Sequence, residues 1–257
     1  MPTKFATGIC ALALLLGAGA VSANEGGHAG WQREADNEIA NLPSLQRGAR
    51  HFMDYCSGCH SLKYMRYSRV AEDLKIADTL RDTYLVKPGA KFTDYITASM
   101  PAADAQEWFG KALPDLSLVA RSRGADWVFN FLTTFYADAA SRQTGVNNLQ
   151  LPGTAMPHVL ASVQGVQNAV WTATEHKGED GKAVVTPEFK TFEMGVVGSL
   201  NKEQYDDFAR DIVNFLQYVS DPTQVDRQSI GIWVVLFLLM FTGIAYMLKK
   251  EYWKDVR

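Results

Sequence analysis

The sequence predicts a mainly α-helical exported domain with extended loops and a small hairpin, followed by one C-terminal transmembrane helix. Three observations support this fold class. Residues 1–23 and 230–248 form two long uncharged or nearly uncharged apolar runs at the chain ends. Between them, residues 43–56 and 201–219 carry apolar side chains at spacings of three and four, the period of an amphipathic helix.

The N-terminal run has the pattern of a secretory signal. Lys4 precedes an uncharged stretch from Phe5 to Val21, and small residues follow at Ser22 and Ala23, where a signal peptidase would cut. The alternative is a transmembrane anchor, but this Gly- and Ala-rich run is short for a membrane span. We therefore expect residues 1–23 to be a cleaved signal peptide and the mature chain to begin at Asn24.

The C-terminal run predicts a membrane anchor. Residues 230–248 contain no charge and come close to the ~20 residues that a spanning helix needs. Aromatic residues suited to the membrane interface flank or end the run: Trp233, Tyr246, Tyr252 and Trp253. The basic residues Lys249, Lys250, Lys254 and Arg257 follow it, so the positive-inside rule predicts a cytoplasmic tail at 249–257 and an external domain at 24–229.

The external domain is mildly acidic. Without Lys4 and the tail's four basic and two acidic residues, it keeps 20 basic and 26 acidic residues, a net charge of −6. This balance argues against a nucleic-acid partner and is compatible with a basic protein partner. The carboxylates that could form an acidic face are Asp104, Glu107, Asp115, Glu179 and Asp180, although scattered solvated carboxylates are the simpler interpretation.

Two cysteines carry the chemistry of the external domain. Cys10 leaves with the predicted signal, which leaves Cys56 and Cys59. Their spacing is compatible with a redox disulfide, half of a zinc site or haem attachment. His60 follows directly, which makes Cys-Ser-Gly-Cys-His the attachment motif of a c-type haem: both thiols become thioethers and the histidine coordinates iron. A zinc site would need a second pair of ligands.

Two predicted helices flank this motif in the fold. Pro43 can open the first, which places Leu45, Ala49, Phe52 and Cys56 on one face, and Gly48 permits close approach of another helix. Asn201 and Gln204 form a capping box for the second, and Asp221-Pro222 ends it. Its apolar stripe is Tyr205, Phe208, Ile212, Phe215, Leu216 and Val219. The pair resembles the crossing terminal helices of class I cytochromes c and supports the haem rather than ligating it.

A sixth iron ligand is not identified by spacing alone. The candidates in the external domain are His28, His51, His158, His176, Met53, Met65, Met100, Met156 and Met194. Met53 and Met65 lie too close in sequence to His60 to reach the opposite haem face. His28 lies in a Gly-rich terminus and His176 in the polar stretch EHKGEDGK, which is typical of a solvated turn. Met100 and Met156 both precede a proline in an irregular segment, and periodicity does not separate them.

Three segments resemble the cytochrome c1 family, the haem c subunit of bacterial-type cytochrome bc1 complexes. They are RGARHFMDYCSGCHSLKYMRY, KALPDLSLVARSR and LPGTAMPHVL. The resemblance implies that Met156 is the sixth ligand and that Arg121 faces a haem propionate. It also implies that the remaining haem-pocket residues are Leu113, Pro114, Tyr64 and Tyr67. Ser68 follows Tyr67 where the family often has arginine, so Arg66 or Arg69 could supply that contact.

The resemblance also implies a function. The subunit would accept an electron from the Rieske iron–sulfur protein and pass it to cytochrome c, within a dimeric complex that contains cytochrome b and membrane lipid. It would have no substrate site of its own. The alternatives are a monohaem electron-entry subunit of a haem–copper oxidase, or a haem c peroxidase or gas-binding protein. Residues 174–195 have no family counterpart, and their alternation predicts a hairpin with a Gly-Glu-Asp-Gly turn.

Overall fold

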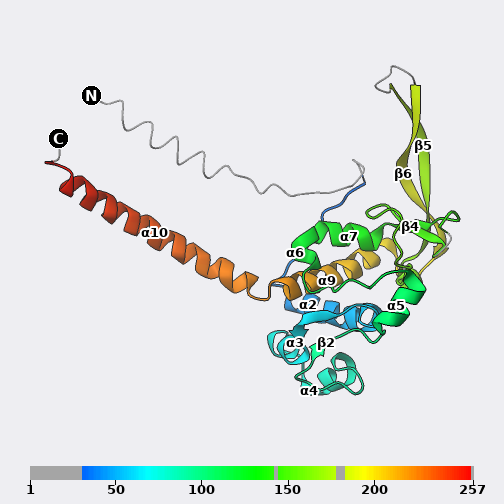
Figure 1. Ribbon diagram of the computed structural model, residues 1–257, viewed down its shortest axis with the longest axis horizontal. Coiled ribbons are helices and arrows are strands. Elements are labelled where there is room, and N and C mark those ends of the chain that lie inside the picture. The colour runs from blue at the N-terminus through cyan, green and yellow to red at the C-terminus, as the bar shows by residue number, and fades with distance from the viewer. Residues whose placement is uncertain (1–30, 142–143, 178–182, 256–257) are drawn as a thin grey trace.

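A computed structural model describes residues 31–141, 144–177 and 183–255. A helical body carries a two-stranded arm and a long C-terminal helix (Figure 1). The helical elements are α2 (Leu42–His51), η1 (Phe52–Cys56), α3 (Tyr67–Asp73), α4 (Asp78–Leu80), η2 (Arg81–Leu85), α5 (Ala102–Phe109), α6 (Val119–Arg123), α7 (Ala125–Thr133), α8 (Ala161–Gln164), α9 (Lys202–Ser220) and α10 (Gln224–Tyr252). The antiparallel strand pairs are β1 (Leu62–Arg66) with β2 (Tyr95–Ile96), β3 (Phe135–Ala137) with β4 (Val146–Asn148), and β5 (Gly165–Lys177) with β6 (Ala183–Val197).

The first predicted helix is confirmed as α2 followed by the π-helical turn η1. The side chain of Asn41 accepts a hydrogen bond from the backbone N–H of Ser44 at 3.2 Å, and Pro43 lies in the first turn, where its missing N–H costs nothing. The four predicted stripe residues are all buried: Leu45, Ala49, Phe52 and Cys56. This stripe carries the helix from its cap to the first cysteine of the motif.

The second predicted helix is confirmed as α9. Asn201 and Gln204 make the reciprocal bonds of the capping box, and the helix ends before Asp221. All six predicted stripe residues are buried. A Cβ added at Gly48 would lie 1.9 Å from the carbonyl oxygen of Asp211, so only glycine lets α2 approach the α9 backbone this closely. The predicted close approach at Gly48 is therefore confirmed.

A buried carboxylate joins the same two helices. Asp211 of α9 accepts hydrogen bonds from Ser44 Oγ at 2.5 Å and from Arg47 Nε and Nη2 at 2.6 and 2.8 Å. Asn214 Nδ2 donates to Ser44 Oγ at 2.6 Å, so the serine hydroxyl is held from both sides. Since a buried charge needs such partners, the network fixes the register of α2 on α9.

The predicted hairpin is present, but it is longer than residues 174–195. Strands β5 and β6 pair from Gly165–Val197 at the base outward to Lys177–Ala183, and the arm extends away from the helical body in Figure 1. Trp171 and Phe189 are cross-strand partners whose ring centroids lie 5.9 Å apart. This aromatic pair stabilises strand pairing closer to the base of the hairpin than residue 174, where the segment predicted from alternation begins. The predicted Gly-Glu-Asp-Gly turn lies outside the described residues.

The predicted span lies within α10. This helix is longer than the 230–248 run, and its most apolar 18-residue window has a mean hydropathy of 2.3 with none of its residues buried. In Figure 1 α10 projects from the end of α9. By length and composition it is a helix that could cross a membrane. The predicted signal at 1–23 and the last two residues of the predicted tail lie outside the described residues.

Candidate haem-attachment site

The two cysteines and His60 lie in one tight turn. η1 ends at Cys56, and the carbonyl oxygen of Cys56 accepts hydrogen bonds from the backbone N–H groups of Cys59 at 3.1 Å and His60 at 2.8 Å. Cys56 is buried, Cys59 is partly exposed, and neither forms a disulfide. The structure thus brings the three residues of the predicted attachment motif together.

The His60 ring is oriented by Pro114. Its Nδ1 lies 2.8 Å from the Pro114 carbonyl oxygen, which can only accept, so Nδ1 carries the proton. The other ring nitrogen, Nε2, then holds a lone pair. His60 is only 8 % exposed, and burial lowers its pKa, so the ring is neutral at physiological pH. A neutral imidazole with one nitrogen anchored and the other free is a suitable ligand for iron.

The segment that contains Pro114 runs along the chain after His60. The N–H of Leu116 donates to the Ser61 carbonyl at 2.9 Å, and the N–H of Lys63 donates to Asp115 Oδ2 at 2.9 Å. Asp115, one of the carboxylates suggested for an acidic face, therefore has a structural role here. This contact sets the position of the carbonyl that orients His60.

A second segment binds the turn itself, and the sequence did not predict it. The Gly58 carbonyl accepts hydrogen bonds from the N–H groups of Ser99 at 3.1 Å and Met100 at 2.9 Å. Lys87 Nζ donates to the Ser57 carbonyl at 2.5 Å. These hydrogen bonds join residues that are 30 to 42 positions apart in the sequence. Such long-range contacts produce no periodic pattern, so the sequence did not indicate them.

The two candidate methionines lie in different surroundings. Met100 is tied by its backbone to the attachment turn. Met156 is half-buried in the irregular segment between β4 and α8, where its N–H donates to Thr154 Oγ1 at 3.3 Å. Nearby, the His158 ring stacks on Phe135 at 5.0 Å, and its Nε2 lies 3.1 Å from the Gly165 carbonyl. His158 is therefore already engaged by the protein.

The other predicted pocket residues do not all share one environment. Tyr67 is 1 % exposed and begins α3, whereas the Tyr64 side chain is 71 % exposed. Leu113 is half-buried and Pro114 is exposed apart from its role at His60. Arg121, on α6, lines a cavity of about 510 Å³ beside α7.

The three candidate propionate arginines differ in their partners. Arg66 donates to the Thr93 carbonyl and stacks on Tyr95, and Arg69 pairs with Asp73 at 2.5 Å. Within residues 31–141, 144–177 and 183–255, the structure gives Arg121 no hydrogen bond or ion pair. Arg121 is therefore the one of these three guanidinium groups that remains available to an anionic group.

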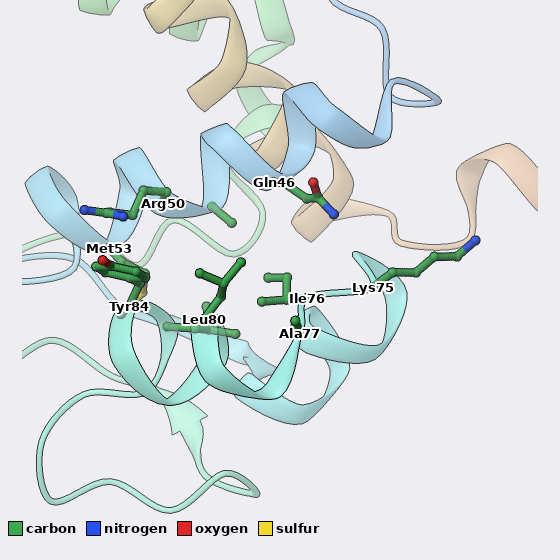
Figure 2. A pocket seen from close by; sticks show the side chains of 10 residues that line it. Gln46, Arg50, Met53, Lys75, Ile76, Ala77, Leu80 and Tyr84 are labelled. Carbon is green, nitrogen blue, oxygen red and sulfur yellow. The ribbon is translucent and has the colours of Figure 1, made fainter.

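Another cavity, of about 260 Å³, lies between α2 and residues 75–85 and does not belong to this site. Figure 2 shows Ile76, Leu80 and Tyr84 facing α2 across it. Met53 and Arg50 line its other wall, and the Arg50 guanidinium lies 3.9 Å from the centroid of the Tyr84 ring. Neither cysteine nor His60 lines this cavity, so it is not where the attachment motif would place a haem.

The chemistry of the cysteines fits thioethers better than thiolates. Burial raises the pKa of the Cys56 thiol to about 12, whereas redox and zinc-binding cysteines act as thiolates. A thioether carries no charge, so burying it incurs no such penalty. In the part of the chain that the structure describes, no three His, Cys, Asp or Glu side chains are arranged to hold a metal ion. The buried Cys56 thiol, the neighbouring Cys59 and the oriented His60 ring fit a covalently attached haem.

Comparison with known proteins gives a consistent result. The model of the Cytochrome C1 family matches residues 31–175 and 195–256. Cytochrome c1 of Allochromatium vinosum is 44% identical over 96% of this chain and 98% of its own length. The ammonia monooxygenase gamma subunit of Nitrosomonas europaea is 39% identical over 87% of this chain and 88% of its own. Cytochrome b/c1 of Bradyrhizobium diazoefficiens is 27% identical over 82% of this chain and 33% of its own.

The family match includes every predicted site residue, and the similarity to the Allochromatium protein extends over nearly both chains. The predicted resemblance is thereby confirmed. The chain belongs to the cytochrome c1 family, the haem-containing electron-transfer subunits of cytochrome bc1 complexes.

Proposed function

We propose that this subunit carries one haem c attached to Cys56 and Cys59, accepts single electrons from the Rieske iron–sulfur protein, and passes them to cytochrome c. The observation that carries the proposal is the Nδ1–Pro114 contact of 2.8 Å, which prepares His60 as an axial ligand beside the two cysteines. When bound, haem c supplies a one-electron Fe(III)/Fe(II) couple. The chain supplies binding, orientation and exclusion of water.

His60 is the proximal ligand in this proposal. Its neutral state follows from burial, and its orientation follows from the Pro114 carbonyl. A hydrogen bond from Nδ1–H to a carbonyl increases the basicity of the other nitrogen and holds the ring in one rotamer. The same arrangement limits reorganisation of the ligand during electron transfer.

Met156 is the proposed sixth ligand. The sixth ligand must approach from the haem face opposite His60. Met100 is bonded through its backbone to Gly58, in the same turn as His60, which argues against its reaching that opposite face. Both methionine side chains are half-buried, but Met156 lies in a separate irregular segment that has no such bond to the turn, so the geometry favours it over Met100. Met/His ligation raises the haem potential.

The remaining pocket roles follow the family resemblance. Arg121, whose guanidinium has no partner among the residues that the structure describes, is proposed to face a propionate. Leu113, Pro114 and Tyr67 are proposed to line the haem pocket. Tyr64 is proposed to line the pocket as well, at its exposed edge, because its side chain is open to solvent.

The membrane setting is part of the proposal. Residues 1–23 are removed as a signal, residues 24–229 lie in the periplasm, residues 230–248 of α10 cross the inner membrane once, and residues 249–257 are cytoplasmic. The partners are cytochrome b, the Rieske protein and lipid, in a dimeric complex whose quinol chemistry lies outside this chain. The relative named cytochrome b/c1 supports cytochrome b as a partner. This chain matches only 33% of that relative's length, and the name indicates that the same polypeptide also contains cytochrome b.

An optical spectrum of the purified membrane complex tests the assignment to this complex. A reduced α-band of c-type haem that co-purifies with b-type haems is expected. A c-type haem that purifies with a haem–copper oxidase and no bc1 subunits would contradict it.

Paired methionine variants test the ligand assignment. Met156→Leu should abolish the sulfur-to-iron charge-transfer band and lower the potential or open the iron to carbon monoxide. Met100→Leu is the matched control and should keep the band. The reverse pattern would assign the ligand to Met100.

A further inference from the structure

Lys87 places an ammonium group against the attachment turn. It follows η2 by two residues, and its Nζ donates to the Ser57 carbonyl at 2.5 Å and to the Thr97 carbonyl at 2.7 Å. Ser57 lies between the two cysteines in sequence. The ammonium is thus held on the turn that connects the two proposed thioether positions.

This positive charge has no local counter-charge. Both acceptors are neutral carbonyl groups, and across the three described segments of the chain no carboxylate pairs with Lys87. The nearby cations differ, since Arg50 pairs with Asp54 at 2.6 Å and Arg81 pairs with Asp78 and Asp82 at 2.7 Å each. Lys87 is half-buried, so solvent screens its charge less than that of an exposed lysine.

We propose that Lys87 raises the reduction potential of the haem, an inference that rests on the proposed attachment at Cys56 and Cys59. Fe(III) haem carries one more positive charge than Fe(II) haem, so a fixed ammonium beside the attachment turn disfavours the oxidised state. Unit charges about 12 Å apart at an effective dielectric constant of about 20 change an equilibrium constant about tenfold. For a one-electron couple, tenfold corresponds to about 59 mV.

A purely structural role is the competing explanation, because the same ammonium links the turn to Thr97. Substitutions of Lys87 separate the two. Glutamine keeps N–H donors for the carbonyl groups and removes the charge, whereas arginine keeps both charge and donors. Lys190→Gln, at an exposed position on β6, is the control for loss of a lysine elsewhere.

The measurement is a redox titration of the haem c α-band in the intact purified complex. Lys87→Gln should make reduction of the haem up to about tenfold less favourable. Lys87→Arg and Lys190→Gln should have the reduction potential of the wild type. All three variants should keep the α-band position and bind no carbon monoxide. A wild-type potential in Lys87→Gln overturns the proposal. Equal decreases of the reduction potential in Lys87→Gln and Lys87→Arg, with a disturbed α-band, also overturn the proposal and assign Lys87 a structural role.

A second variant leaves Lys87 intact in case Lys87→Gln does not assemble haem. Thr97 is exposed, and its carbonyl accepts the Lys87 bond, so Thr97→Glu brings a carboxylate near the ammonium. The potential should fall relative to Thr97→Gln, and equal potentials in these two variants overturn the proposal. A wild-type complex without any c-type α-band would instead contradict the proposed function itself.

Discussion

The close approach of α2 to α9 makes Gly48→Ala a severe substitution. The added Cβ would lie 1.9 Å from Asp211 O and 2.8 Å from Phe215 Cβ, whereas ordinary contact begins at 3.4 Å. The α2 and α9 backbones would have to part by about 1.5 Å at this point, the difference between 3.4 and 1.9 Å. The displacement would also stretch the bonds from Ser44 and Arg47 to Asp211.

The change in the free energy of unfolding caused by Gly48→Ala follows from two opposing effects. Overpacking costs about 1–3 kcal/mol, and the upper end applies because the obstacles are backbone and a Cβ rather than a flexible side-chain end. Replacing a helical glycine by alanine returns about 1 kcal/mol of helix propensity. The net loss is about 2 kcal/mol, which for a domain of this size lowers Tm by about 4–8 °C.

Thermal unfolding of the full-length protein in detergent, followed by circular dichroism, measures this loss. Gly243→Ala in α10 is the matched control, because a Cβ there meets nothing within 4 Å. Its Tm should not fall below that of the wild type, because it gains helix propensity without any clash. A Gly48→Ala protein that unfolds at or above the wild-type temperature would refute the close approach of α2 and α9.

Three further predictions concern other parts of the molecule. A chain of residues 24–229, exported to the periplasm, should be soluble and keep a low-spin haem spectrum, because both proposed iron ligands lie outside α10. Failure to incorporate haem would show that the span does more than anchor. The net charge of −6 suggests that a basic cytochrome c is steered electrostatically, so its reduction should slow as the Debye length falls from ~30 Å at 0.01 M salt to ~10 Å at 0.1 M. Asp104→Asn with Glu107→Gln, on α5 directly after Met100, should flatten that dependence, and a rate that is flat in the wild type would exclude steering. The His51 ring lies against Phe208, with centroids 4.0 Å apart and the rings tilted by 34°. Burial lowers the pKa of His51, so the unfolded chain binds the proton more strongly. The contribution of neutral His51 to the free energy of unfolding should therefore be fully present above the ordinary histidine pKa near 6.5 and decrease below it. Between pH 8 and 5.5, the Tm of His51→Phe should decrease less than the Tm of the wild type. Equal decreases would contradict this role of His51.

The sequence predicted α2 and α9 well because their signals are local. A capping box, a proline in the first turn and an apolar stripe all lie within one element, and each has one physical consequence. Gly48 was also interpretable, because a glycine on the buried face of a helix indicates a close neighbour. That neighbour is the Asp211 carbonyl. Its identity was not predictable, because Asp211 lies 163 residues further along the chain.

The surroundings of His60 were predictable only in part. The attachment motif identifies the two thiols and the proximal ligand by chemistry that depends on adjacent residues. The carbonyl of Pro114 and the segment that contains Ser99 and Met100 reach the turn through long-range hydrogen bonds. Apart from the His60 Nδ1 donor, the groups that make these bonds are backbone groups that any sequence possesses. The hairpin shows the same limit, because its base pairs through residues whose alternation is interrupted by register shifts.

The family match and the fold together separate the haem-binding part of the molecule from the arm. The match stops at residue 175 and resumes at 195, an interval that covers the outer part of the hairpin. The base of the hairpin belongs to the body, since Gln167 Nε2 donates to the carbonyl groups of Thr133 at 3.0 Å and Phe135 at 2.8 Å. The attachment turn, the Pro114 segment and the Met156 segment all lie within matched residues. The residues proposed to bind the haem therefore all lie in the matched part of the chain, and none of them lies in the outer hairpin.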